Sequence, residues 1–185
     1  MNAYGPSFYH IEPNHIVFQH ATVHKWYQVS IDLKLEDHTG NDKRANIYGL
    51  MTEGSTFPNI GSLIPAVFIW GTNNMEVCLF LDGSEACVAL PAYTPEEWFN
   101  ITVEQYCWIN CYVIVWIDAT IQFWWNINAE TFYNVEGVIG NTYKQEDIVA
   151  ASGLYKNFNF DQSEDGTGIT WLVTDEPDSE AAANA

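Results

Sequence analysis

Four cysteines are spaced so that two disulfide bonds can form across tight turns. Cys78 and Cys87 are placed symmetrically about the dipeptide Asp82-Gly83. Asp-Gly is typical of a two-residue hairpin turn, in which both central residues need a positive φ. Counting outward from this turn places the two cysteines opposite each other in a non-hydrogen-bonded pair, whose Cα atoms lie about 4.5 Å apart. That separation is within reach of a disulfide bond.

The second pair, Cys107 and Cys111, brackets the tripeptide Trp108-Ile109-Asn110 in the same way. Disulfide bonds persist in oxidising compartments, so two of them indicate an extracellular protein, either secreted or held at the cell surface. Four free thiols in a buried core are the alternative, because cysteine also behaves as a small apolar residue. A chain of 185 residues can bury a core of its own, so the disulfides are expected to be local staples.

Paired carboxylates are the catalytic feature to look for first in an acidic chain. Glycoside hydrolysis uses two carboxyl groups about 5–10 Å apart. Glu130 and Glu136 are near each other in the sequence but straddle an apparent turn at residues 132–134. No Ser-His-Asp or Cys-His arrangement has a supporting context, because the cysteines are expected in disulfide bonds. We therefore expect that the protein is not an enzyme.

Two acidic loops offer oxygen ligands for a calcium ion, which needs several of them to converge. Asp37, Asn41 and Asp42 lie in one loop, and Glu146 and Asp147 lie in another. Neither loop has the regular spacing of an EF-hand, so solvated loop charge is the alternative. Calcium is the one candidate cofactor, and the sequence implies no other.

Four histidines, His10, His15, His20 and His24, precede the main strand pattern. On a helix, His20 and His24 would share a face and could bind a metal. On a strand their Cβ atoms would lie about 13 Å apart, given a rise of about 3.3 Å per residue. We therefore expect surface histidines.

The charge balance excludes several partners. The chain has 24 acidic and 6 basic residues, a net charge of -18, and Arg44 is its single arginine. Nucleic acids and anionic membranes need clustered Lys and Arg, so neither is an expected partner. No run of 18 apolar residues is present, so membrane insertion is not expected either. Asn100-Ile101-Thr102 is the only N-glycosylation sequon, which predicts a glycoprotein carrying a glycan on Asn100.

Aromatic residues are dense, with 8 Trp, 10 Tyr and 10 Phe, and most are expected in the core. Trp124 and Trp125 are adjacent, so on a strand their indoles point to opposite faces. Trp108 lies in the short loop of the second cysteine pair and is hard to bury there. Exposed indoles stack on sugars or contact other proteins. These three tryptophans are a candidate contact surface, and a loop folded over them is the alternative.

The elements that must position these residues are strands. Residues 27–35 alternate, with apolar Tyr27, Val29 and Ile31 on one face and Gln28 and Ser30 on the other, which predicts a half-buried strand. About ten to thirteen strands with frequent turns favour an all-β chain folded as an antiparallel two-sheet jelly-roll sandwich. The other expected strands are 16–18, 47–51, 66–70, 98–103, 112–117, 121–125, 135–139, 155–160 and 169–173, together with the hairpin of the first cysteine pair and a turn at Asp118-Ala119.

Several segments in this order resemble the laminin-G-like and pentraxin-like branch of concanavalin-A-type jelly rolls, across roughly residues 24–160. Residues 26–35 are similar to its opening strand Y-x-V-S-x-x-L-K. Residues 64–69 are similar to R-I-P-A-V-W-F, with Leu63 at the basic position. Residues 112–117 are similar to Y-x-I-x-I-N-G, with Asp118-Ala119 in place of Asn-Gly. Further similar segments are 90–101, 128–135 and 150–158.

The resemblance implies a concanavalin A-like fold in an extracellular protein. This fold hosts lectins, adhesion modules, hormone carriers and glycosidases, so it does not fix a ligand. The Glu-x-Asp-x-x-Glu strand of the related β-glucanases is missing. We therefore expect a non-enzymatic extracellular module for cell adhesion or structure, which can self-assemble into oligomers or filaments. The alternative is a carbohydrate-binding lectin, with or without calcium. The expected partners are other copies of the chain or extracellular glycans and proteins.

The predicted organisation is a jelly-roll domain over residues 16–173, an N-terminal arm over residues 1–15 and a mobile acidic tail over residues 174–185. The arm is apolar up to residue 13, and the sequence indicates no partner for it within the chain. An arm of this kind can add a strand to the sheet edge of a neighbouring molecule. An arm packed on its own domain is the alternative.

Overall fold

The computed structural model describes residues 8–52, 64–81, 84–107, 109–127, 131–142 and 148–172. Within these ranges the chain forms strands and no helix, so no described segment is a helix that could cross a membrane. The strands are β1 (Tyr9–His10), β2 (His15–Val23), β3 (Trp26–Leu35), β4 (Arg44–Thr52), β5 (Ala66–Trp70), β6 (Asn74–Leu81), β7 (Ser84–Leu90), β8 (Trp98–Cys107), β9 (Cys111–Ile117), β10 (Thr120–Ile127), β11 (Phe132–Ile139), β12 (Ile148–Ala150) and β13 (Gly153–Ser163).

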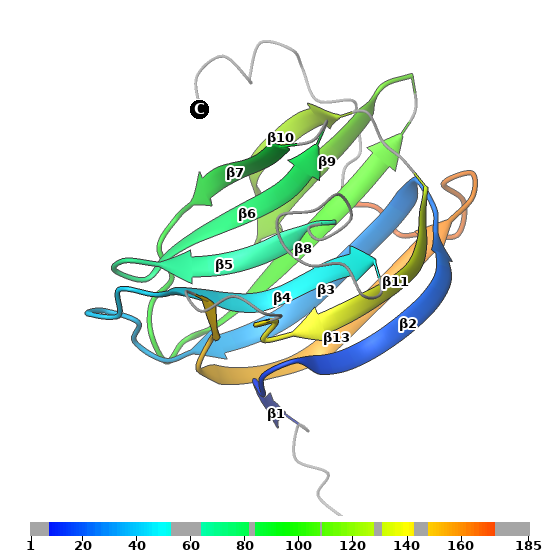
Figure 1. Ribbon diagram of the computed structural model, residues 1–185. Coiled ribbons are helices and arrows are strands. Elements are labelled where there is room, and N and C mark those ends of the chain that lie inside the picture. Colours follow the sequence, from blue (N-terminus) through cyan, green and yellow to red (C-terminus); the bar gives the residue numbers. More distant parts are fainter. Residues whose placement is uncertain are drawn as a thin grey trace, which may run out of the picture.

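These strands form two sheets that pack face to face (Figure 1). The 6-stranded sheet has the order β1-β13-β3-β8-β9-β10. The 7-stranded sheet has the order β2-β11-β4-β5-β6-β7, with β12 also paired to β4. The β12–β4 pairing is parallel and all the others are antiparallel. The predicted fold class, an all-β two-sheet sandwich, is confirmed.

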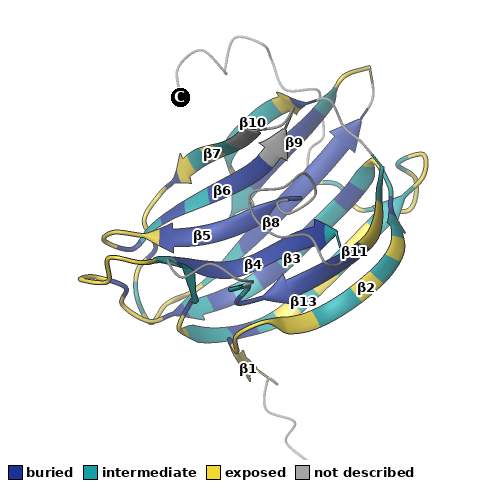
Figure 2. Ribbon diagram, in the orientation of Figure 1, coloured by how far each residue is buried: buried dark blue, intermediate teal, exposed yellow. Residues whose placement is uncertain are grey.

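Strand β3 shows why the sandwich has a clear inside and outside. From Tyr27 onward every second residue is buried, and the residues between them are only half-buried (Figure 2). Strand β8 continues the pattern, since Ile101 lies opposite Ile31 and Val103 opposite Val29. Apolar residues of the other sheet pack against them from β4, β5 and β6. Inward side chains that are 0% exposed include Val29, Ile31, Leu33, Leu35, Ile47, Val67, Ile101, Val103, Val113 and Val115.

Both cysteine pairs are disulfide-bonded, with Cα atoms 4.1 Å apart in each. Cys78 of β6 lies opposite Cys87 of β7, in the register that a two-residue turn at residues 82–83 predicts. Cys107 ends β8 and lies opposite Cys111, which begins β9. Each disulfide therefore closes one hairpin within a sheet and does not join the two sheets.

The first described residues lie against the chain's own sandwich. Tyr9 and His10 form β1 and pair with Tyr155 and Leu154 of β13. The next residue, Ile11, donates its N–H to the Gly153 carbonyl at 3.0 Å. The described part of the predicted arm thus pairs with a strand of the same chain. This agrees with the alternative of an arm packed on its own domain. Residues 1–7 and the predicted acidic tail lie outside the described residues.

Two expected elements are wrong. Residues 132–134 form the start of β11, not a turn, because Phe132 pairs with Val23 of β2. Residues 169–172 form no strand. Their contacts are with the outer face of the 6-stranded sheet, where the Trp171 ring lies 5.7 Å from the Trp26 ring. We call residues 164–172 the C-terminal strap.

The disulfide pattern is directly testable. Peptide mapping of the unreduced protein should recover Cys78–Cys87 and Cys107–Cys111 as the linked pairs. Loop-closure entropy gives each bond about 2–3 kcal/mol, so reduction should lower the free energy of unfolding while the far-ultraviolet circular dichroism stays that of a β protein. Crossed pairs, or four thiols that can be alkylated without reduction, would contradict the structure.

Gly137 of β11 tests the packing between β2 and the core. A Cβ atom at this position would overlap the Phe18 ring, which stacks on Phe160 with the ring centroids 4.5 Å apart. Gly137→Ala should therefore lower the free energy of unfolding by about 1–3 kcal/mol, measured by urea denaturation. The double variant with Phe18→Leu should lose less than the sum of the two single variants, and strict additivity would contradict the overlap.

Candidate functional site

The outer face of the 6-stranded sheet carries a band of polar side chains. On β3, Gln28, Ser30 and Asp32 alternate with buried apolar residues and therefore point away from the core. The β3–β8 register places Asn100 opposite Asp32 and Thr102 opposite Ser30. Amides, hydroxyls and carboxylates thus gather at the centre of the sheet, where strands on both sides fix their backbones.

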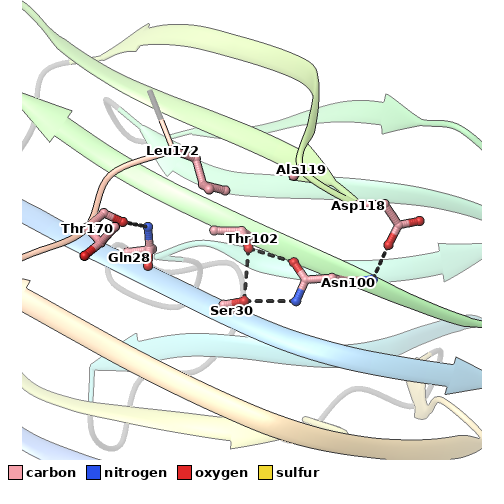
Figure 3. Close-up of a pocket in the computed structure, with 8 residues that line it drawn as sticks. All are labelled: Gln28, Ser30, Asn100, Thr102, Asp118, Ala119, Thr170 and Leu172. Atoms are coloured by element: carbon pink, nitrogen blue, oxygen red, sulfur yellow. Dashed lines mark hydrogen bonds between the residues drawn. The ribbon is translucent and has the colours of Figure 1, made fainter. Parts of the chain in front are cut away.

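A pocket of about 350 Å³ opens over this band (Figure 3). Its volume is within the range of small-ligand sites. Strands β3 and β8 form the floor, the β9–β10 turn contributes one part of the wall, and the C-terminal strap contributes another. The lining residues are Gln28, Ser30, Asn100, Thr102, Asp118, Ala119, Thr170 and Leu172.

Hydrogen bonds hold the floor of the pocket in one arrangement. The Asn100 side-chain NH₂ donates to Ser30 Oγ at 3.0 Å and to Asp32 Oδ1 at 2.9 Å. The Thr102 hydroxyl donates to Asn100 Oδ1 at 2.8 Å. Asp32 Oδ2 accepts a further bond from Asn157 of β13 at 2.6 Å. The amide of Asn100 is therefore oriented before any ligand arrives.

Asp118 brings a carboxylate to the rim of the pocket. It forms the predicted turn with Ala119, and both residues have a positive φ, 48° and 58°. Asp118 Oδ1 accepts the backbone N–H of Asn100 at 2.8 Å, and the Asp118 N–H donates to the Asn100 carbonyl at 3.1 Å. The turn is thus fastened to the first residues of β8.

Glu104 fastens the strap to the sheet. Its side chain is 0% exposed, and a buried carboxylate requires hydrogen-bond donors. Glu104 Oε1 accepts from Gln28 Nε2 and from the Leu172 backbone N–H, both at 2.7 Å, and Oε2 accepts from Trp116 Nε1 at 2.8 Å. Gln28 Nε2 also donates to the Thr170 carbonyl at 3.0 Å. The strap is therefore part of the site.

Aromatic packing supports the same strap. The Trp171 ring lies 5.5 Å from the Tyr106 ring, edge to face, and its indole N–H donates to the Gly166 carbonyl at 3.0 Å. Gly166 has a φ of +83° and lies against Trp26, so a Cβ atom there would meet the indole ring. Hydrogen bonds from Thr167 hold the pKa of the neighbouring Asp165 carboxyl below its usual value. The segment before Trp171 is thus a structured turn.

The lining of the pocket suits a ligand rich in hydroxyl groups. Asn, Gln, Ser and Thr side chains offer both donors and acceptors, and a sugar hydroxyl needs both. Among its described residues the lining contains one carboxylate and no cationic side chain. A phosphate or a carboxylate would therefore find no opposite charge in the lining. The site favours a neutral polyol.

The residues singled out by the sequence are spread over the molecule. Asn100 lies at the pocket. Its Nδ2 atom, to which an N-linked glycan would be attached, donates hydrogen bonds to Ser30 and Asp32. Trp124 packs edge to face on Tyr112, with the ring centroids 5.4 Å apart. It lies opposite Ile114, which in turn lies opposite Glu104, so its side chain is on the outer face of the sheet. Trp125 packs against the core. Trp108 lies outside the described residues, and glycosylation of Asn100 stays a prediction.

The calcium candidates do not form a converging set among the described residues. Asp37 Oδ1 accepts from the Thr39 N–H at 3.0 Å and from Asn73 Nδ2 at 2.9 Å, and these bonds hold the pKa of the Asp37 carboxyl below its usual value. Asn41 Oδ1 accepts the Lys43 N–H at 3.0 Å. Both side chains thus close turns of their own loop. Glu146 and Asp147 lie outside the described residues, and calcium stays untested.

The pocket itself was not identified from the sequence. The outward alternation of β3 and β8 was visible, but the register that brings Asp32 to Asn100 depends on strands far apart in the chain. The Asp118-Ala119 turn was predicted, yet its placement over Asn100 was not. The sequence predicts a strand at residues 169–173, and the polar contacts of the strap with Gln28 and Glu104 carry no local sequence signal.

Comparison with known proteins supports the fold. No protein-family model and no curated protein sequence matches the chain. The chain is similar to a botulinum neurotoxin type G receptor-binding domain, with a TM-score of 0.50 and 14% identity over 75% of this chain and 35% of that one. It thus spans about a third of that domain's length. It is also similar to an alginate lyase from Alteromonas sp.272, with a TM-score of 0.50 and 15% identity over 76% of this chain and 73% of that one.

A third similar structure is the SAP-like pentraxin of Limulus polyphemus, with a TM-score of 0.51 and 12% identity over 78% of this chain and 67% of that one. The pentraxin-like part of the predicted resemblance therefore holds for the fold. At such identities none of these likenesses transfers a residue role.

The expectation that the chain is not an enzyme is wrong as an exclusion. An alginate lyase has a similar fold, so the fold does not exclude catalysis. The lack of a supported pair of acids or of a cysteine or serine nucleophile does not exclude other catalytic chemistry on this fold.

Glu104 provides a test of the strap. In Glu104→Gln, one of the two oxygens becomes an NH₂ group, which must face an N–H donor in either rotamer. The free energy of unfolding should fall by about 1–3 kcal/mol, and limited proteolysis should cut residues 164–172 faster. Glu164→Gln is the control, because the Glu164 side chain is 83% exposed on the same strap. Equal behaviour of the two variants would contradict the anchoring role.

Proposed function

We propose that the chain is an extracellular carbohydrate-binding domain whose pocket on the 6-stranded sheet binds a neutral sugar. The observation that carries the proposal is the pre-oriented lining of hydroxyl, amide and carboxylate groups around Asn100. A rigid polar floor binds hydroxyl groups without first losing conformational freedom. The two disulfide bonds support the extracellular setting.

Charge supports a neutral ligand over an acidic one. The chain has a net charge of -18, and Asp32, Glu104 and Asp118 lie in or next to the pocket. A polyuronate or a sulfated glycan would approach like charges at distances well inside the screening length of about 8 Å at physiological salt. A neutral glycan meets no such repulsion, and its hydroxyls can donate to the Asp118 carboxylate.

The similar structures agree with a binding role at the level of the fold. One is a receptor-binding domain and another a pentraxin. These names supply no ligand for this chain, so the proposal depends on the pocket.

Protein–protein adhesion is a second candidate, and one exposed residue favours it. Ile109 is 90% exposed at the tip of the turn that the Cys107–Cys111 bond closes. A large apolar side chain held out by a disulfide fits a contact with another protein, including a second copy of the chain. Light scattering tests self-association through Ile109. If this candidate is right, the unmodified protein should have a higher molar mass in solution than the Ile109→Ser variant.

A glycan array tests the carbohydrate proposal. The protein should retain neutral glycans in preference to acidic ones, and arrays with and without a chelator show whether calcium takes part. Asp118→Asn keeps the acceptor for the Asn100 N–H but removes the charge, so binding should weaken about tenfold or more. Glu12→Gln, an exposed residue far from the pocket in the sequence, is the charge-matched control. Retention of acidic glycans alone, or of none, would refute the proposal.

A further inference from the structure

A second cavity lies on the other side of the Asp118-Ala119 turn. It has a volume of about 220 Å³ and shares Asp118 with the first pocket. The loop that precedes β8 forms much of its wall. Its lining residues are Met75, Pro91, Ala92, Tyr93, Thr94, Glu97, Trp98, Phe99, Ile117, Asp118 and Gln122.

The aromatic part of this lining is held firmly. The Tyr93 ring stacks on the Phe99 ring, with the centroids 6.0 Å apart. The Tyr93 hydroxyl donates to the Glu36 carbonyl at 2.7 Å, and burial raises the pKa of Tyr93 to about 12. Tyr93 therefore keeps its hydroxyl proton, and with it this hydrogen bond, at neutral pH.

Trp98 of β8 lines the second cavity and is close in the strand to Asn100, which lines the first. It precedes Asn100 by two residues, so both side chains point outward, roughly 6.6 Å apart along the strand. The Trp98 side chain is 40% exposed, and Lys156 Nζ lies 4.2 Å from the centroid of its ring. This cation–π contact orients an indole that remains accessible.

The composition of the second cavity also fits a sugar. Sugar rings present apolar C–H faces that pack on aromatic rings and hydroxyl groups at their edges. Trp98 offers an exposed aromatic ring on the outer face, and Glu97, Gln122 and Asp118 offer polar groups. A purely apolar ligand would leave these polar groups without partners.

We propose that the two cavities form one extended site for a neutral oligosaccharide, with Trp98 as the stacking residue of the second sugar unit and Asp118 contacting both units. This inference rests on the proposed carbohydrate binding at the first pocket and adds the length of the ligand. It places the second sugar unit of the ligand in the second cavity, beside the loop that precedes β8.

Isothermal titration calorimetry with sugars of increasing length tests the inference. The probes are glucose, mannose and galactose, each with its β-linked di-, tri- and tetrasaccharide. The unmodified chain should bind the disaccharide of its preferred sugar about five- to tenfold more tightly than the monosaccharide, the gain expected for one stacking contact. Trp98→Ala should remove this gain and leave monosaccharide binding within about twofold, because the first pocket does not include Trp98.

Two further variants keep the test specific. Gln122→Ala should partly reduce the gain in affinity from the monosaccharide to the disaccharide, because Gln122 lines the second cavity and not the first. Trp70→Ala is the matched control, because Trp70 is 45% exposed on the other sheet and should change neither affinity. Thermal unfolding of each variant separates a local loss from a loss of fold.

The outcomes separate this inference from the proposed function. Monosaccharide binding with no gain for longer sugars, or a gain that survives Trp98→Ala in a folded protein, overturns the extended site and leaves the first pocket standing. Absence of binding by every probe overturns both.

Discussion

The register in which β3 pairs with β8 determines both the core and the candidate site. With Ile31 opposite Ile101 and Asp32 opposite Asn100, the aliphatic side chains of the two strands point inward, and the polar side chains of Ser30, Asp32, Asn100 and Thr102 point outward. A slip of one residue would place the whole polar band in the core, because side chains alternate strictly along a strand. The burial of Ile31 and Ile101 thus fixes the position of Asn100, and the packing energy of the core maintains the geometry of the pocket.

Glu104 shows how this arrangement accommodates a buried charge. A carboxylate on a central strand is costly unless donors surround it, and here they come from β3, β9 and the C-terminal strap. The strap also covers the aromatic end of the same face, where Trp171 packs on Trp26 and Tyr106. The strap and the Asp118-Ala119 turn therefore border the pocket. This boundary gives the pocket its size.

Local patterns predicted much of the fold. The bounds of β3 and β5, the β6–β7 hairpin with its cysteines and the Asp118-Ala119 turn all follow from alternation and turn chemistry, which act over a few residues. The site did not follow, because it combines Ser30, Asn100 and Thr170 from distant parts of the chain. The same reason explains the strap: the local pattern of residues 169–172 is that of a strand, but their contacts with Glu104 and Tyr106 are made by a segment without strand structure.

The position of β3 within its sheet also has a kinetic consequence. Its two neighbours are β8 and β13, which lie far along the chain, so β3 can be completed only after long loops have closed. Non-local pairing of this kind slows folding. During synthesis, residues 26–35 leave the ribosome long before residues 153–163, and the face that carries the pocket cannot assemble until translation has passed residue 172. In the interval the backbone hydrogen-bonding groups of β3 are unpaired. A chaperone that binds the nascent chain would protect this strand from aggregation.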